Sequence, residues 1–276
     1  RHPTRERIAM HANPMEIESL QRVFREGFSA ADIAESLVSF DDSVATAELA
    51  TFMEENAYQV VGIRREGRIV GVLERTLLVE SQDAPVAQLT QAIDNRDVIH
   101  SSASFAEIVL GLDRSPRLFV KAFGEIGGIV TFGDLSKPPL RMWLFGMITI
   151  IEMRLSWIID RFCGGDDWRE CISAGRLEKA ETLLAERQRR HQDLDLLDCL
   201  QFSDKGQIIA RSKELRAMMQ FESRRQVEDV IKGLERLRNN LAHSQDILSD
   251  WKTIVKLAEN LDRVLFGPAK LRELND

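Results

Sequence analysis

Residues 38–73 read VSFDDSVATAELATFMEENAYQVVGIRREGRIVGVL, and this stretch decides the fold of the front half of the chain. A brief strand at Val38–Phe40 precedes a turn of Asp and Ser that can cap a helix, and Val44–Asn56 carries apolar residues at helical spacing. Tyr58–Ile63 is a β-branched run, RREG is a hairpin turn, and Arg68–Leu73 is the return strand. The order strand–helix–strand–turn–strand predicts a small α+β unit.

The same order of signals recurs further along the chain. Gly71-Val72-Leu73 and Gly128-Ile129-Val130 lie 57 positions apart, which indicates an internal duplication. Each copy is too small to bury both faces of its short sheet, so the two copies are expected to pack on each other. The second copy is assigned to Val98–Ser101 (strand), Ser104–Leu112 (helix), Leu118–Val120 (strand) and Ile126–Thr131 (strand).

These stretches resemble a CBS-domain pair, or Bateman module, over residues 15–137. The resemblance implies an adenine nucleotide such as AMP, ADP or ATP as a regulatory ligand, held by a Thr or Ser and by an Asp three residues later. Copy two has this pattern as Thr131 and Asp134, whereas copy one reads Glu74-Arg75-Thr76-Leu77 and lacks the Asp. One family-like site is therefore expected at most. The alternative is that Thr131 and Asp134 only cap the next helix.

From Pro138 onward strand signals vanish and helical periodicity dominates. The pattern predicts an all-helical bundle of four or five helices over residues 138–276, whereas residues 1–14 are expected to form a disordered or loosely ordered tail. Gly164-Gly165 and Gly267-Pro268 mark two helix ends. The main helices are expected at Leu140–Phe162, Arg176–Leu196, Gln207–Met218, Phe221–Asn240 and Asp250–Phe266.

The stretch ERLRNNLAH at Glu235–His243 resembles the R-x4–6-H motif of HEPN domains. Arg238 and His243 match the two motif positions, Asn239 directly follows the Arg, and LLDCLQFSDKGQII at Leu196–Ile209 resembles a HEPN segment between helices. The resemblance covers about residues 140–266. It implies a metal-independent endoribonuclease, a hydrolase that binds RNA and works as a homodimer. A partner of the toxin–antitoxin or defence type is compatible with it, but the sequence does not identify one.

These residue types suit RNA cleavage without a metal. His243 can transfer a proton at neutral pH, Arg238 can hold the scissile phosphate, and Asn239 can orient either group. On one ideal helix, however, positions five apart are separated by about 140°. Either the helix ends between Arg238 and His243, or a second chain completes the site. The alternative is a non-enzymatic regulator in which His243 caps a helix end, Arg238 forms an ion pair, and the bundle only dimerises or binds a partner or RNA.

Charge and composition narrow the remaining classes of protein to which the chain can belong. The net charge of −7 comes from the front, with 14 basic and 21 acidic residues before Pro138 and 23 of each after it. The most hydrophobic run, Met142–Ile151, is shorter than the roughly 20 residues of a membrane span. We therefore expect a buried helix there and no membrane partner. The chain has three Cys and no C-x-x-C motif, which fits a protein of the reducing cytoplasm. We expect these Cys side chains in the core. No metal site is expected, because His100 and His191 have no partners at ligand spacing.

Overall fold

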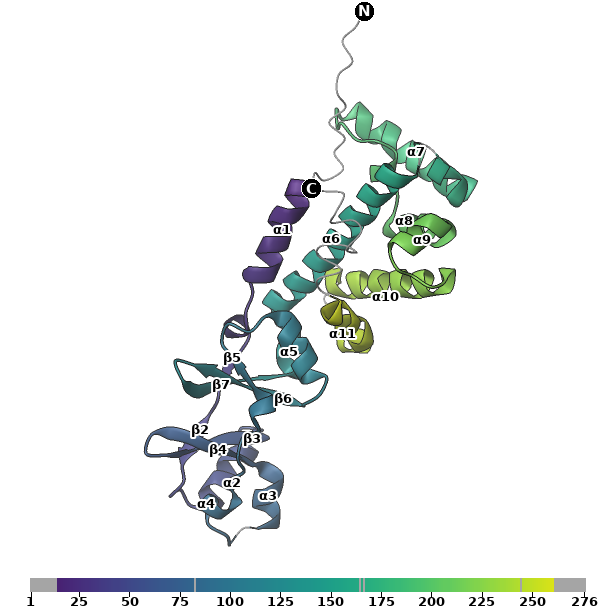
Figure 1. The fold of residues 1–276 in the computed structure, drawn as a ribbon. Coiled ribbons are helices and arrows are strands. Elements are labelled where there is room, and N and C mark those ends of the chain that lie inside the picture. The colour runs from purple at the N-terminus through teal and green to yellow at the C-terminus, as the bar shows by residue number, and fades with distance from the viewer. Residues whose placement is uncertain (1–13, 82, 164, 166, 244, 261–276) are drawn as a thin grey trace, which may run out of the picture. The chain divides into compact units, whose positions relative to one another are not determined.

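The computed structural model describes residues 14–81, 83–163, 165, 167–243 and 245–260. The chain divides into two compact units. Phe28–Leu140 forms an α+β unit, and the described residues before and after it, 14–27 and 141–260, form a helical unit (Figure 1). The two units are described separately below.

The α+β unit is a structural duplication, as the sequence predicts. In each copy one strand pairs in parallel with the next, which then forms an antiparallel hairpin. Both hairpins contain a register shift, at Ile63/Arg64 and at Val120/Lys121, and these shifts are again 57 positions apart. The strands are β2 (Ser39–Asp41), β3 (Val60–Arg65) and β4 (Arg68–Glu74) in copy one, and β5 (Val98–His100), β6 (Arg117–Ala122) and β7 (Glu125–Thr131) in copy two.

The segment that precedes each copy pairs with a strand of the other copy. Strand β1 (Glu35–Ser36) precedes copy one but pairs antiparallel with β7 of copy two. Reciprocally, Gln91 precedes copy two but exchanges two backbone hydrogen bonds of 2.8 Å with Val72 on β4. Between the copies, Leu37, Val72 and Phe119 form a buried apolar cluster. The expected packing of one copy on the other is thereby present.

Both hairpins close with two residues in the left-handed region, as type I′ turns require. Glu66 and Gly67 have φ of 52° and 79°, and the matching Phe123 and Gly124 have φ of 50° and 89°. The helices of the unit cover its sheets and supply much of the core, such as Leu49 and Met53. They are α2 (Thr46–Glu55), α3 (Arg75–Glu80), α4 (Val86–Leu89) and α5 (Phe105–Leu112), with short 3₁₀ turns at Ala30–Asp32, Asn95–Asp97 and Phe132–Ser136.

The helical unit differs from the expected bundle at several helix ends. The helix expected to reach Leu196 ends at Arg189, and His191 follows with a left-handed φ of 59°. The helix expected over Gln207–Met218 is two helices, because the Ser212 side chain caps a new one by accepting from the Leu215 N–H. The helices are α6 (Pro138–Phe162), α7 (Ala174–Arg189), α8 (Phe202–Arg211), α9 (Lys213–Met218), α10 (Arg224–Ala242) and α11 (Trp251–Glu259), with 3₁₀ turns at Asp167–Cys171, Leu197–Cys199 and Leu248–Asp250. At the predicted stop Gly164-Gly165, α6 ends at Phe162 and Gly165 has a left-handed φ of 75°. Gly164, Gly267-Pro268 and the expected helix end at Phe266 lie outside the described residues.

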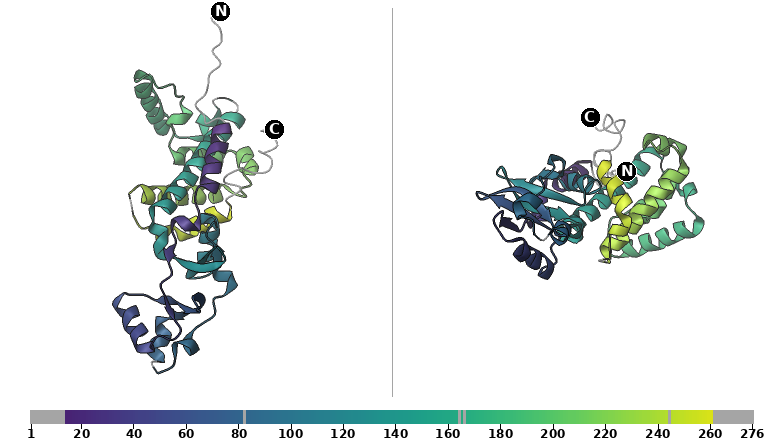
Figure 2. Two further views of the ribbon diagram at one scale, coloured as in Figure 1. Left: turned by 90° about the vertical axis from the view of Figure 1, so that its left-hand side faces the viewer. Right: turned by 90° about the horizontal axis from the view of Figure 1, so that it is seen from below.

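An additional helix, α1 (Pro14–Glu26), belongs to the helical unit although it precedes the α+β unit in sequence. It lies beside α6 (Figures 1 and 2), where the Trp143 indole N–H donates to the Phe24 carbonyl oxygen at 3.0 Å. Gly146 admits the Phe24 ring, because a Cβ at this position would stand 2.0 Å from it. Residues 15–27, which the sequence grouped with the CBS pair, are thus part of the helical unit. The predicted tail at residues 1–13 lies outside the described residues.

Helix α6 is the long apolar helix of the helical unit. It begins with two prolines, which suit the first helical turn because they have no N–H to leave unpaired. Its length and a mean hydropathy of 1.5 over 18 residues satisfy the criteria for a membrane span, and 56% of that window is buried inside the structure. One such helix is weak evidence for a span, because the core helix of a water-soluble protein gives the same values.

Candidate functional site

The C-terminal end of α10 is held by contacts from two other segments. Arg141 of α6 donates to the carbonyl oxygens of Asn240 and Leu241 at 3.0 and 3.1 Å. Asp250, 1% exposed, accepts from the Asn240 side chain at 2.7 Å and forms an ion pair with Arg236. These contacts satisfy carbonyl groups that a helix end otherwise leaves unpaired, so the last turn of α10 is held firmly. The predicted motif residues lie on this turn.

Arg238 faces the interior of the helical unit. Its Nη1 lies 3.4 Å from Glu152 Oε2 on α6, and its guanidinium stands 5.9 Å from the centre of the Phe202 ring on α8. The other oxygen of Glu152 lies 3.3 Å from the ammonium of Lys205, whose side chain is 6% exposed. Glu152 therefore bridges two cations from two helices, and the group of three keeps one excess positive charge. Neither Glu152 nor Lys205 was predicted from the sequence to be a partner of Arg238. Glu152 is a charge within an otherwise apolar helical stretch, whereas Lys205 stands among polar residues and carries no such signal.

His243 occupies the C-cap position of α10 and is exposed. Its backbone N–H donates to the Asn239 carbonyl oxygen at 3.1 Å, so the helical path continues through the whole motif. Among the described residues, the structure records no side-chain partner for His243. Of the two alternatives for the motif geometry, a helix end between Arg238 and His243 is present, because α10 ends at Ala242, one residue before His243. Arg238 is half-buried while Asn239 and His243 are exposed, and among the described residues no hydrogen bond joins the side chains of these three.

Thr131 and Asp134 are brought together, but in a closed turn. Asp134 Oδ2 accepts from the backbone N–H and the hydroxyl of Thr131 at 2.7 and 3.1 Å. Asp134 Oδ1 lies 2.6 Å from the ammonium of Lys137, which also contacts Glu35 Oε1 at 3.0 Å and donates to the Ile33 carbonyl oxygen at 2.7 Å. Asp134 is 4% exposed, and both of its oxygens have partners. The capping role is thus present, and the nucleotide-binding role of Thr131 and Asp134 stays a prediction.

Lys137 occupies Asp134 Oδ1, so the predicted binding of a nucleotide through this oxygen requires that Lys137 be displaced. Burial alone would lower the pKa of its ammonium, but the hydrogen bonds and charges of Asp134 and Glu35 outweigh that effect and raise the pKa. The contribution of this cluster to stability is therefore complete below about pH 10.4, the usual lysine pKa, and is lost as the pH rises through the higher folded-state pKa.

Lys137→Met is accordingly expected to tighten nucleotide binding at this turn, because a ribose no longer competes with an ammonium for Asp134. Calorimetric titration with AMP, ADP and ATP measures the change, and Lys121→Met, an exposed lysine on β6, serves as the control. If the affinity is unchanged by both Lys137→Met and Asp134→Ala, the prediction for Thr131 and Asp134 is wrong.

Copy one uses the matching positions differently. Glu74, at the position of Thr131, forms an ion pair of 2.6 Å with Arg117 of copy two, and the position of Asp134 is taken by Leu77. This arrangement offers no hydroxyl–carboxylate pair for a ligand.

The cysteine thiols are poor candidates for catalysis. Burial raises the pKa of Cys163 to about 11, and it also raises the pKa of Cys171 and of Cys199. A thiol with a raised pKa is largely protonated at neutral pH and is a weak nucleophile. Within the part of the chain that the structure describes, no three His, Cys, Asp or Glu side chains gather as a possible metal site.

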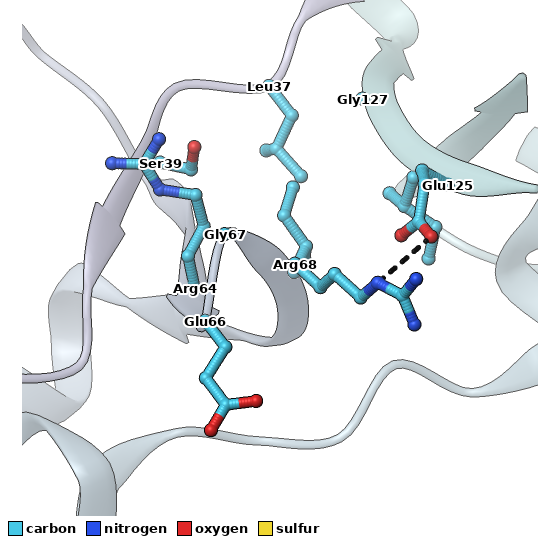
Figure 3. A pocket seen from close by; sticks show the side chains of 10 residues that line it. Leu37, Ser39, Arg64, Glu66, Gly67, Arg68, Glu125 and Gly127 are labelled. Atoms are coloured by element: carbon cyan, nitrogen blue, oxygen red, sulfur yellow. Dashed lines mark ion pairs between the residues drawn. The ribbon is translucent and has the colours of Figure 1, made fainter.

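A cleft of about 570 Å³ lies between the two copies of the α+β unit (Figure 3). Its walls come from the β3–β4 hairpin and from the start of β7. No sequence motif marks it, because its residues come from segments about 60 positions apart.

Comparison with known proteins relates the chain to CBS-domain structures. No protein-family model matches the chain. Among solved structures, a CBS domain of a bacterial CNNM/CorC family Mg²⁺ transporter in complex with ATP is similar at 20% identity and a TM-score of 0.36, covering 45% of this chain and 94% of that one. A hemolysin-like CBS-domain protein of Oenococcus oeni PSU is similar at 14% identity and a TM-score of 0.36, covering 45% and 97%. The duplicated topology, rather than these scores, supports a tandem CBS fold for the α+β unit.

One curated relative also matches part of the chain. It is a phosphoribosylformylglycinamidine cyclo-ligase of Caldicellulosiruptor bescii, 24% identical over 107 residues. The match spans 39% of this chain and 29% of that enzyme.

Proposed function

We propose that this protein is a nucleotide-regulated endoribonuclease, in which the α+β unit binds an adenine nucleotide and the helical unit, of the HEPN type, cuts RNA without a metal. The observation that carries the proposal is the exposed His243 at the end of a firmly held helix, five positions after an Arg238 whose guanidinium is oriented by Glu152 and Phe202. We place the protein in the cytoplasm.

The two side chains suit two different tasks. His243 is exposed to water, and an imidazole is the side chain that most often serves as a general base or acid. Arg238 is one-third exposed, and its planar group can donate to phosphate oxygens while Glu152 restrains it. Asn239 is exposed beside them and can orient one of the groups or the RNA.

In a homodimer, Arg238 of one chain can meet His243 of its partner, whereas within one chain no contact between the two side chains is recorded among the described residues. Met142 and Phe145 on α6 are 62% and 45% exposed, and they follow Arg141, which binds the end of α10. The apolar patch of Met142 and Phe145 therefore lies close in the chain to Arg141, which contacts the end of α10. Its proposed partner is the helical unit of a second copy.

We expect the full chain to be a dimer by multi-angle light scattering and Phe145→Glu to shift it to a monomer, because a charge at a dimer contact loses its hydration. Val79→Glu, at a 68%-exposed apolar residue of the α+β unit, is the matched control and is expected to remain dimeric. A folded, monomeric wild-type chain would contradict the proposed interface.

The experiment that tests the proposed activity is incubation of the full chain with structured RNA in the presence of a chelator, with and without AMP, ADP or ATP. Cleavage in the chelator that leaves 2′,3′-cyclic phosphate ends supports the mechanism. Cleavage that disappears with the chelator rejects a metal-independent mechanism.

A second candidate function is a non-enzymatic nucleotide-sensing regulator, whose helical unit only dimerises or binds RNA or another partner. The ion pair of Arg238 with Glu152 favours this second function, because it gives the guanidinium a structural role within its own chain that requires no catalysis. The two candidates differ in one measurement, since a regulator of this kind binds RNA without shortening it.

A further inference from the structure

A buried lysine lies one contact away from Arg238 in the helical unit. The side chain of Lys205 is 6% exposed, and its ammonium lies 3.3 Å from Glu152 Oε1. The other oxygen of this carboxylate lies 3.4 Å from Arg238 Nη1. A lysine is rarely buried, because a charge that leaves water needs a partner. The place of Lys205 behind Glu152 therefore calls for a physical reason.

Glu152 is the counter-ion that Lys205 and Arg238 share. Asp204, directly before Lys205, is engaged elsewhere: it forms an ion pair with Arg176 and accepts from the Gln201 N–H at 3.1 Å. Among the described residues, the recorded partner of the Lys205 ammonium is Glu152. The single carboxylate of Glu152 thus serves two cations from two helices.

Close packing of α8 on α10 fixes the two cations relative to each other. Gly206 directly follows Lys205, and a Cβ on it would stand 2.6 Å from the Ile231 side chain of α10. The two helices can approach this closely only because position 206 has no side chain. Arg238 lies seven residues after Ile231, which is about two helical turns along α10.

The group of three side chains lacks one negative charge. Its formal charges are two positive and one negative, and a phosphodiester carries the one negative charge that is missing. The distances of 3.3 and 3.4 Å exceed the roughly 2.8 Å of a tight charge-assisted hydrogen bond, so Glu152 binds neither cation firmly. Arg238 is 33% exposed and Lys205 only 6%, so an incoming phosphate reaches Arg238 and not Lys205.

The presence of Lys205 changes what happens when a phosphate takes Arg238 from Glu152. Without Lys205, the largely buried carboxylate would lose its counter-ion and would lie beside a second anion, which is strongly unfavourable. With Lys205, the carboxylate keeps a cation throughout. Arg238 is therefore free to exchange one anion for another.

We infer that Lys205 is a positioning residue of the RNA site, which retains Glu152 when a phosphate of the RNA takes Arg238. Lys205 does not touch the RNA and acts through Glu152. The inference rests on the proposed function and names the residue that makes its phosphate-binding arginine available.

The test is binding of the full chain to RNA with 2′-O-methyl riboses, followed by fluorescence anisotropy in a chelator. This RNA lacks the attacking hydroxyl, so binding is measured apart from cleavage. Lys205→Met is expected to weaken binding by about ten- to a hundredfold, the value of one hydrogen bond between charged groups, because Arg238 then stays with Glu152. The slope of log K against log salt should also fall by about 0.7, the contribution of one phosphate contact on a single strand.

A second change separates this role from a merely structural one. Adding Glu152→Gln to Lys205→Met is expected to restore wild-type affinity, because the anion that retains Arg238 is then gone. A structural role of Lys205 predicts the opposite, since a second change in the same buried group damages the packing further. Lys205→Arg, which keeps the charge, and Lys213→Met, at an exposed lysine of α9, are the matched controls and are expected to bind like the wild type.

The outcomes separate this inference from the proposed function. If the wild type binds RNA and Lys205→Met binds it equally well, or if the double variant stays as weak as Lys205→Met, the role of Lys205 is overturned while the proposed function stands. If the wild type binds RNA without cleaving it, the endoribonuclease proposal fails, and these affinities still decide the role of Lys205. If the wild type binds no RNA with or without ATP, both fail. Circular dichroism checks folding, and Lys205→Gln replaces Lys205→Met if the methionine variant does not fold.

Discussion

Replacing His243 with alanine is expected to reduce RNA cleavage by roughly 10²–10⁴-fold, the usual contribution of a positioned proton-transfer group. The reason is that His243 is the exposed imidazole at the end of α10, and its removal leaves no group there to move the proton of the attacking hydroxyl. The fold is expected to survive, because the described contacts of His243 are made by its backbone. Initial rates on a defined RNA in chelator measure the loss.

His191→Asn is the matched control for this variant. His191 is also exposed, and asparagine tolerates the left-handed φ of 59° that this position requires. Cleavage by the control should equal that of the wild type. Cleavage that persists in His243→Ala would reject the assigned role of His243.

Arg238→Ala is expected to be similarly inactive, because it removes the charge that stabilises the transition state. If the dimer assembles each site from Arg238 of one chain and His243 of the other, a mixture of the two inactive variants regains activity in heterodimers that contain one intact site. A mixture that forms heterodimers but stays inactive would contradict a shared site.

Asp250→Ala is expected to cause the largest loss of stability in the helical unit. Asp250 is 1% exposed and accepts from Arg236 and from Asn240, both on the last turns of α10. Each hydrogen bond to a charged group contributes about 1.5–3 kcal/mol, so the free energy of unfolding should fall by at least about 2 kcal/mol. Urea unfolding followed by circular dichroism measures this change.

Asp229→Ala provides the comparison for Asp250→Ala. Asp229 lies on the same helix, is 71% exposed, and stands 3.9 Å from Arg225, so its removal should change stability by less than about 0.5 kcal/mol. Equal stability of the two variants would show that the Asp250 network does not hold α10. The same network positions the motif turn, so Asp250→Ala should also slow cleavage.

Much of the α+β unit could be predicted from the sequence because its signals are local. Alternating β-branched residues, the helix at Val44–Asn56 and the RREG turn each depend on neighbours within a few positions, and the structure contains strands, a helix and a turn there. The repeat of Gly71-Val72-Leu73 at Gly128-Ile129-Val130 predicted the duplication for the same reason. Helix ends were less predictable, as at His191 and Ser212, because small differences in free energy decide where a helix stops.

The contacts at the candidate sites were less predictable from the sequence than the fold was. The spacing of Thr131 and Asp134 along the chain was sufficient to predict that they meet, because they are three residues apart in one turn. It did not predict that Lys137 and Glu35 close that turn, since Glu35 comes from a strand about 100 positions earlier.

By itself, then, the sequence determined the duplicated α+β unit, the helical second part, and the spacing along the chain of Thr131 and Asp134 and of Arg238 and His243. Only the tertiary structure decided that α1 joins the helical unit, that Glu152 bridges Arg238 and Lys205, and that a cleft forms between the β3–β4 hairpin and the start of β7. The reason is physical. Local patterns depend on backbone preferences and on periodicity within a few residues. Ion pairs and cavities depend instead on which distant segments the core brings together, and on which volume a missing side chain leaves open.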